Sequence, residues 1–200
     1  MNLISVCSRG VLADVKKAVG EGADVNAADA SGRTALLEAA WNGNADIVKY
    51  LLEQGADPNA ADKSGFTPVM RGAEGGYLPV VNALIAKGAD VNCRGHVRGT
   101  TPLMLAAEHG HVKIISALLA VGAEVNAADS YEETALARAY RTEQDKAAQL
   151  LESKGGRGKP ERSSYSNSDR ELRPMTRASL PQWTAGGPQD GGDDDSGGSY

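Results

Sequence analysis

The chain has 200 residues, of which 41% are apolar and 4% aromatic, and its formal net charge is −5. This length is sufficient for one elongated domain and a tail, while so few aromatic residues are untypical of a large compact core. The charge balance offers no basic footprint for nucleic acid, and polar residues interrupt the apolar ones near the N-terminus, so neither a secretory signal nor a membrane span is expected. We therefore predict a cytoplasmic protein without nucleic-acid or membrane partners.

A segment of 33 or 34 residues recurs along most of the chain. Each complete copy opens with a threonine and ends with the pattern Gly-Ala-x-x-Asn. The opening threonines are Thr34, Thr67, Thr101 and Thr134, and the closing patterns begin at Gly22, Gly55, Gly88 and Gly122. A period of this length indicates a supersecondary unit that is stacked on copies of itself.

Within each copy the pattern predicts two helices joined by a tight turn. The threonine hydroxyl can cap the first helix, and Pro68 and Pro102 stand where the first helical residue needs no N–H donor. The second helix carries an apolar stripe at helical spacing, as in residues 47–52. Glycines such as Gly43 between the helices and Gly55 after the second one suit a left-handed backbone.

The residues between each asparagine and the next threonine predict a projecting β-turn finger. Asp29 and Asp62 each begin an Asp-x-x-Gly turn there. The segment between Asn92 and Thr101 is one residue longer than its counterpart and lacks this turn pattern, so that finger should differ in shape from its neighbours.

The two ends of the array differ from the middle. The first copy starts directly at its first helix and is expected to be an N-terminal cap. The last copy has polar residues at 143–146, which suits a C-terminal cap. Residues 157–200 are rich in Gly, Pro and Ser and end in an acidic run, so we predict a disordered tail.

Taken together, these residues resemble the ankyrin repeat over about residues 1–156. The resemblance implies an all-α solenoid of about five helix-turn-helix repeats with β-turn fingers, followed by the disordered C-terminal tail. The expected repeats cover about residues 1–29, 30–62, 63–96, 97–129 and 130–156. The resemblance also implies a non-catalytic protein–protein interaction module. Such a module would act as an adaptor or as a regulatory or inhibitory subunit, and we expect the chain to be a monomer on its own.

In that family the finger tips and the exposed side of the first helix form a concave face, where a protein partner usually binds. Several positions that vary between copies on this face carry Arg, Trp, Phe or Tyr, types enriched at binding hot spots. The candidate partner-binding residues are Arg33, Trp41, Asn42, Phe66, Met70, Arg71, Glu74, Arg98, Glu108, Tyr131 and Arg138. The alternative for Phe66 and Trp41 is packing on the next repeat or on a neighbouring helix end. For Met70, Arg71 and Arg138 it is an ordinary solvated or inter-repeat side chain.

Catalytic and metal sites are the competing hypotheses. Only Cys93, His96, His109 and His111 cluster as soft or imidazole ligands, and a zinc site would need four such groups at tetrahedral spacing. In the family resemblance His111 coincides with a histidine that makes a structural hydrogen bond. No nucleophile elbow, phosphate loop or H-E-x-x-H helix is present, so no enzyme, metal or cofactor is expected.

The tail offers an alternative function. Residues 170–183 have the character of a linear motif, and Ser179 follows Arg177 at a spacing compatible with phosphorylation. In a variant of this hypothesis Trp183 occupies the chain's own concave groove and masks it.

Overall fold

A computed structural model describes residues 2–95 and 98–158 of the chain, and these residues contain ten α-helices and no strand. The prediction of an all-α fold is thereby confirmed. The predicted tail lies outside the described residues from position 159 onward, as do its candidate motif at 170–183 and Trp183. The helices are α1 (Leu3–Ser8), α2 (Leu12–Gly20), α3 (Ala35–Trp41), α4 (Ala45–Glu53), α5 (Pro68–Glu74), α6 (Leu78–Ala86), α7 (Pro102–Glu108), α8 (Val112–Ala120), α9 (Ala135–Arg141) and α10 (Asp145–Ser153).

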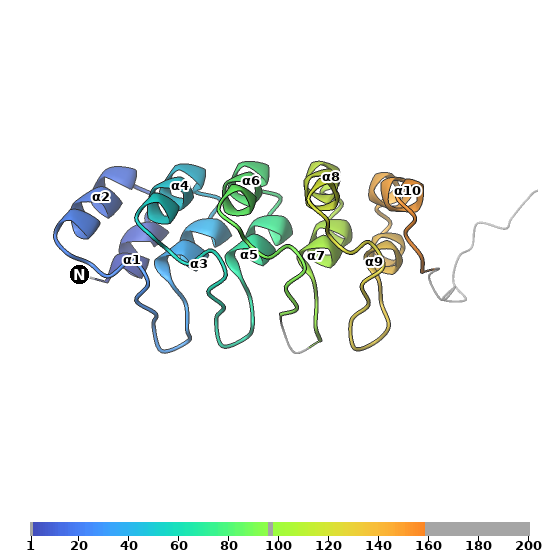
Figure 1. Ribbon diagram of the computed structural model, residues 1–200, viewed down its shortest axis with the longest axis horizontal. Helices are drawn as coiled ribbons and strands as arrows, with labels where there is room; N and C mark the ends of the chain where they lie inside the picture. The colour runs from blue at the N-terminus through green and yellow to red at the C-terminus, as the bar shows by residue number, and fades with distance from the viewer. Residues whose placement is uncertain (1, 96–97, 159–200) are drawn as a thin grey trace, which may run out of the picture. The chain divides into compact units, whose positions relative to one another are not determined.

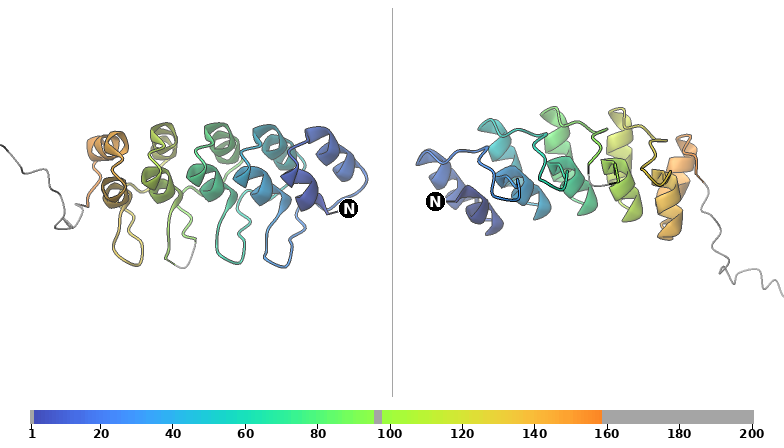
Figure 2. Two further views of the ribbon diagram at one scale, coloured as in Figure 1. Left: turned by 180° about the vertical axis from the view of Figure 1, so that it is seen from behind. Right: turned by 90° about the horizontal axis from the view of Figure 1, so that it is seen from below.

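The helices of the repeat region form two parallel rows. The odd-numbered helices make one row and the even-numbered helices the other, and each odd helix pairs with the even helix that follows it (Figure 1). Finger-like loops project from the side of the odd-numbered row (Figure 1), and their described residues are 27–33 (first finger), 60–66 (second), 93–95 with 98–100 (third) and 127–133 (fourth). Figure 2 shows the same arrangement from behind and from below.

The threonines begin the odd-numbered helices, as the sequence predicts, with one exception. The hydroxyl groups of Thr34, Thr101 and Thr134 accept hydrogen bonds from the backbone N–H three residues later, at 3.2 to 3.3 Å. Thr67 makes no such cap, because its hydroxyl lies 3.3 Å from Sγ of Cys93, at the start of the following finger.

The core of the repeat region runs through the whole stack. The large apolar side chains of the even-numbered row pack on those of the neighbouring repeats and on the odd-numbered row. Residues such as Leu51, Leu84 and Leu118 have no exposed surface. Because one helix pair is too small to cover its own apolar face, the stability of each repeat depends on its neighbours.

An asparagine ladder connects consecutive repeats. Asn59 donates from Nδ2 to the carbonyl oxygen of Gly88 at 3.3 Å and accepts from the backbone N–H of Asp90 at 2.8 Å. Asn26, Asn92 and Asn126 make the corresponding pairs of bonds. The recurrence of Gly-Ala-x-x-Asn therefore has a structural cause, since each asparagine fixes the start of the next finger.

The glycine between paired helices is required for two reasons. Gly76 has a φ of 77°, which favours glycine, and a Cβ atom added there would lie only 2.6 Å from the ring of His111 in the following repeat. A Cβ atom added at Gly43 would likewise lie 2.6 Å from the ring of Tyr77 in the following repeat. The turn therefore needs a residue without a side chain both for its backbone and for contact between repeats.

The last repeat departs from this rule, and the departure leads to a testable expectation. Among the described residues, only Glu132 and Glu143 combine a side chain with a positive φ, and they stand at the positions of Gly99 and Gly110 one repeat earlier. A left-handed backbone costs a residue with a side chain about 1–2 kcal/mol, and glycine avoids this cost. Glycine also raises the conformational entropy of the unfolded chain, which offsets part of the gain. We therefore expect Glu143→Gly to raise the free energy of unfolding by about 0.5–1 kcal/mol. Urea denaturation measures the change.

The matched control for this expectation is Gln149→Gly, at an exposed position in the interior of α10. That change should instead destabilise, since glycine in a helix interior costs about 1 kcal/mol. Equal losses in both variants would contradict the backbone account of Glu143.

The third finger closes differently from its neighbours. Asp29, Asp62 and Asp129 hold the other three fingers by accepting hydrogen bonds from the backbone two and four residues later. In the third finger the backbone N–H of Gly95 donates to the carbonyl of Thr100 at 3.1 Å. Arg94 additionally donates to the carbonyl oxygen of Ala128 in the fourth finger at 2.8 Å.

Candidate functional site

Most of the residues that the sequence predicts to bind a partner lie on the fingers and the odd-numbered helices. They form two groups. The first group lies between α3 and α5, and the second between α7 and α9. Both groups are built around an arginine that stands four residues after an opening threonine, namely Arg71 and Arg138.

Arg71 is fixed from four sides. Its guanidinium carbon lies 3.6 Å from the centroid of the Phe66 ring and 4.7 Å from that of the Trp41 ring. Its Nη atoms donate to Asp62 and Glu74, each at 3.2 Å. Cation–π contacts and two charge-assisted hydrogen bonds together hold the side chain in one position.

A groove opens beside this cluster. It is a cavity of about 300 Å³, and it is lined by Arg33, Leu37, Glu38, Trp41, Asn42, Asp62 and Arg71. Leu37 forms an apolar part of the wall and is almost fully buried, whereas Trp41 is 50% exposed. Half of a large aromatic side chain is therefore left facing solvent, beside an arginine that cannot move away.

Arg138 has a similar set of partners but is buried. Its Nη atoms donate to Asp129 at 2.8 Å, to Glu108 at 2.9 Å and to the hydroxyl of Thr100 at 3.1 Å. Its Nε lies 3.7 Å from a carboxylate oxygen of Glu133 and is the one buried side-chain polar atom without a hydrogen bond among the described residues.

The neighbouring groups set the pKa of Asp129. Burial acts to raise this pKa, but hydrogen bonds from Arg138 and from the backbone N–H groups of Tyr131 and Glu133 outweigh it. The net pKa of Asp129 therefore lies below its ordinary value of 3.8. The carboxylate is ionised at neutral pH and forms a true ion pair with Arg138.

The third and fourth fingers present another cation–π pair. The guanidinium carbon of Arg98 lies 4.7 Å from the centroid of the Tyr131 ring, and Tyr131 is 65% exposed. A backbone hydrogen bond of 2.9 Å from Ser130 to the carbonyl of Arg98 ties the two fingers together.

Comparison with protein families decides the identity of this array. The family model described as ankyrin repeats (3 copies) matches residues 3–95 and again residues 93–159. The chain belongs to the ankyrin repeat family. Ankyrin repeats are generally protein–protein interaction modules, and theirs is a non-catalytic interaction fold. A comparison with curated proteins gives no match.

Two residues proposed from the ankyrin register need correction. Met70 has no exposed surface, because its terminal methyl lies under Gly95 of the following finger. Arg138 is only 5% exposed, because Thr100 and three carboxylates surround it. Neither side chain is available to a partner, so their ankyrin role is packing between repeats.

The other proposed residues, which lie on the fingers and the odd-numbered helices or at their ends, retain exposed surface. Arg33, Trp41, Asn42, Arg98 and Tyr131 are exposed, and Phe66, Arg71, Glu74 and Glu108 are half-buried. Sequence reasoning missed Leu37, Glu38 and Asp62, which also line the groove. The register contained a signal for Glu38, since it occupies the position that holds Arg71 and Arg138 in other repeats.

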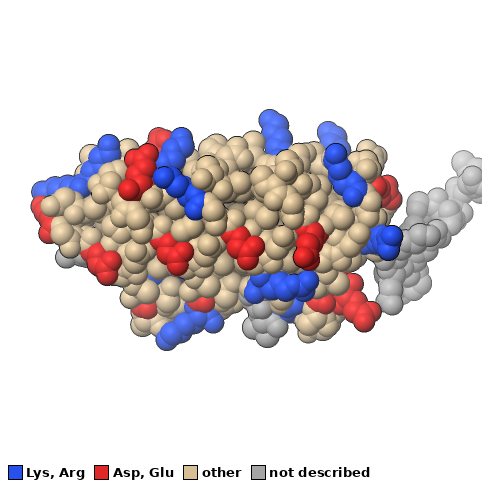
Figure 3. Space-filling model, viewed as in Figure 1, with Lys and Arg blue, Asp and Glu red and all other residues tan. Residues whose placement is uncertain are grey.

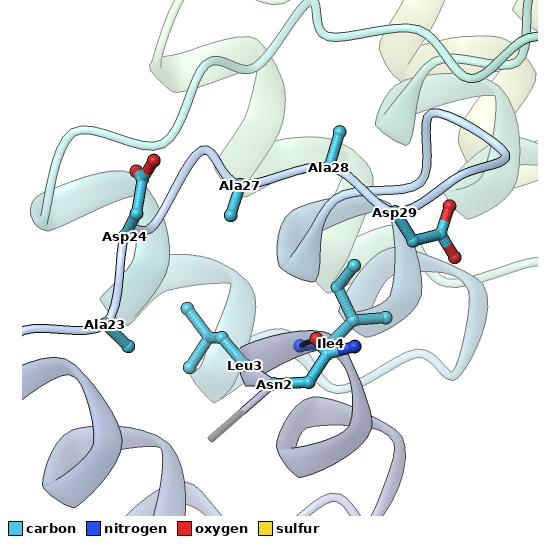
Figure 4. Close-up of a pocket in the computed structure, with 8 residues that line it drawn as sticks. All are labelled: Asn2, Leu3, Ile4, Ala23, Asp24, Ala27, Ala28 and Asp29. Atoms are coloured by element: carbon cyan, nitrogen blue, oxygen red, sulfur yellow. Dashed lines mark hydrogen bonds between the residues drawn. The ribbon is translucent and has the colours of Figure 1, made fainter.

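A second cavity of about 270 Å³ lies at the first ankyrin repeat (Figure 4). Leu3 and Ile4 at the start of α1 face the segment 23–29 across it. Most of the lining is small or aliphatic, and no aromatic or basic side chain takes part. We therefore give this cavity no role in recognition.

Two of the residues weighed for metal binding, His111 and Cys93, make contacts within the ankyrin stack. Nε2 of His111 lies 3.1 Å from the carbonyl oxygen of Glu74, the structural hydrogen bond that the resemblance implies. Residues 2–95 and 98–158 hold no group of three or more metal-ligating side chains, and His96 lies outside these ranges.

Both cysteines of the ankyrin domain are free thiols. Burial, followed by the charge of Glu38, raises the pKa of Cys7 to about 11, and burial also raises the pKa of Cys93. A thiol needs a lowered pKa to act as a nucleophile at neutral pH, so the environments of both residues disfavour that chemistry.

No helix in the described parts of the ankyrin chain has both the length and the apolar character that crossing a membrane requires.

Proposed function

We propose that the chain is a non-catalytic adaptor or regulatory subunit that binds a protein partner on its concave ankyrin face. The observation that carries this proposal is the half-exposed Trp41, held beside the groove that Arg33, Leu37 and Asp62 help to form. Tryptophan and arginine are over-represented among residues that dominate binding energy, particularly when they line a pocket.

The rigidity of this site favours binding. Arg71 is held by Asp62 and Glu74 and by two aromatic rings before any partner arrives. Ordering a long side chain at an interface costs about 0.5–1.5 kcal/mol, and a side chain that is already fixed avoids this cost. The asparagine ladder likewise fixes the fingers relative to the helices.

We place the edge of the interface at the exposed pair Arg98 and Tyr131 on the third and fourth fingers. A partner that reaches from Trp41 to Tyr131 would cover four consecutive repeats. Our proposal further takes the chain to act in the cytoplasm as a monomer before it binds, without nucleic acid or membrane, which is consistent with its acidic balance.

Trp41→Ala in the full chain tests the proposal. We expect that affinity purification from cells of the source organism will retain at least one protein with the parent chain and lose it with Trp41→Ala. The expected loss is at least 2 kcal/mol of binding free energy, roughly the threshold of a hot spot, or about 30-fold in Kd.

Val121→Ala is the matched control for this experiment. Val121 is 48% exposed and caps α8 in the other row of helices, so its removal should leave capture unchanged. Capture that survives Trp41→Ala but fails with Val121→Ala would place the interface on the opposite side and refute the proposal.

A further inference from the structure

We propose that the groove at Trp41 accepts a positively charged side chain, an arginine or a lysine, presented by the protein partner. This inference rests on the proposed function and specifies the chemistry of the partner at that site. Three features carry it: the charge of the groove, the exposed indole, and a comparison among the repeats themselves.

The groove and its rim carry more negative than positive charge. The lining itself is balanced, since it holds Glu38 and Asp62 together with Arg33 and Arg71. Asp29 and Glu74 pair with these two arginines from outside the lining and bring the net charge of the six groups to −2. Each guanidinium is shared between two carboxylates. An acidic partner group would therefore meet two arginines that are already occupied, and four like charges.

Asp29, Asp62 and Glu74 each accept a hydrogen bond from an arginine, whereas none of the described arginines donates one to Glu38. One of its oxygens accepts from Nδ2 of Asn42 at 3.1 Å, while the other only approaches Arg33 at 4.0 Å. A carboxylate can accept about four hydrogen bonds. Covering Glu38 with an apolar partner would remove water without replacing it, a cost that a cationic donor avoids.

The repeats provide an internal comparison for this position. In the second and fourth fingers the aspartate pairs with an arginine on the following helix, Asp62 with Arg71 on α5 and Asp129 with Arg138 on α9. At the first finger the corresponding residues are Asp29 and Glu38, so two carboxylates stand where those two fingers place an ion pair. Arg33, from the same finger, contacts both carboxylates.

Trp41 completes the site for a cation. Its ring already attracts one guanidinium, that of Arg71, and half of its surface remains exposed. A second cation that lay against the indole could also donate to Glu38. Arginine suits this geometry better than lysine, since its planar group stacks on aromatic rings and donates in a fixed fork.

The surroundings favour the approach of a basic segment. Residues 1–156 carry a formal net charge of −4. Figure 3 shows acidic side chains recurring at regular intervals along one long face of the stack. Such a field raises the association rate of a basic partner and loses strength as salt is added.

Selection from a random peptide library displayed on phage, with the immobilised full chain, tests the inference. We expect the selected peptides to be enriched in arginine and lysine. Their binding to Glu38→Gln should be about tenfold weaker than to the parent chain, and it should weaken further with added salt. Asp46→Asn is the matched control, because it also removes one negative charge but lies on α4, in the other row of helices.

Glu38→Arg separates recognition from folding. This change recreates at the first finger the pair formed by Asp62 and Arg71, so the thermal midpoint should not fall while basic peptides are excluded. Peptides that are lost with Trp41→Ala but carry no excess of basic residues would overturn the charge inference and leave the proposed function standing. Peptides whose binding is indifferent to Trp41→Ala would overturn both.

Discussion

Arg138→Ala should lower the free energy of unfolding by about 3–5 kcal/mol, the usual cost of removing one partner from a buried ion pair. Arg138 is 5% exposed and donates to Asp129 and Glu108, which both belong to the preceding repeat. The alanine variant would leave the buried carboxylate of Asp129 without its cation. The loss should appear as a lower midpoint in urea denaturation followed by circular dichroism.

Arg141→Ala is the control for this prediction. Arg141 contacts the same carboxylates, Glu108 and Glu133, but its side chain is 50% exposed. Exposed ion pairs contribute about 0–1 kcal/mol, so the loss should be much smaller. Similar losses of unfolding free energy for both variants would contradict the view that burial makes the ion pairs of Arg138 stabilising.

The pH dependence of stability should follow from the same pair. The pKa of Asp129 is lower in the folded chain than its ordinary value of 3.8, so this carboxylate contributes stability that is fully present above that value. The contribution is lost as the pH falls through the lower folded-state pKa. Without Arg138 the largest hydrogen bond that lowers this pKa is gone, so the variant should lose less stability on acidification than the parent chain.

Leu84→Ala should cost about 2–5 kcal/mol, the range for a large-to-small change in a core. Leu84 lies on α6 in the central repeat and has no exposed surface. Because α6 packs on both α4 and α8, the cavity would weaken two interfaces between repeats at once. Urea denaturation, followed by both circular dichroism and Trp41 fluorescence, measures the loss.

Leu119→Ala is the matched change at a partly buried position of α8. It removes the same atoms, but a site that is partly open to solvent should lose roughly half as much or less. An unchanged urea midpoint for Leu84→Ala would contradict the view that stability resides in the interfaces between repeats.

The sequence predicted the fold because its signals are local and periodic. The threonine cap and the glycine turn each depend only on a few residues that are close in sequence. Most of these caps and turns form as predicted. Thr67 departs because its hydroxyl meets Cys93, which is 26 residues away. A distance of that kind cannot be read from the repeat alone.

The candidate site was predicted less completely for the same reason. The register places Trp41 and Arg71 on the same face, but only the structure brings the ring of one repeat against the guanidinium of the next. Equivalent positions also differ in what covers them. Met70 and Leu37 stand at the same place in successive repeats and are both buried, but Leu37 lines the groove whereas Gly95 lies over Met70.

The central claim is that the concave ankyrin face holds the partner, and hydrogen–deuterium exchange tests it most directly. The full chain would be measured alone and in complex with the protein that it captures. We expect slower exchange in α3, α5 and the fingers at residues 27–33 and 60–66. Slower exchange confined to α4, α6 and α8, or to residues 159–200, would contradict the claim.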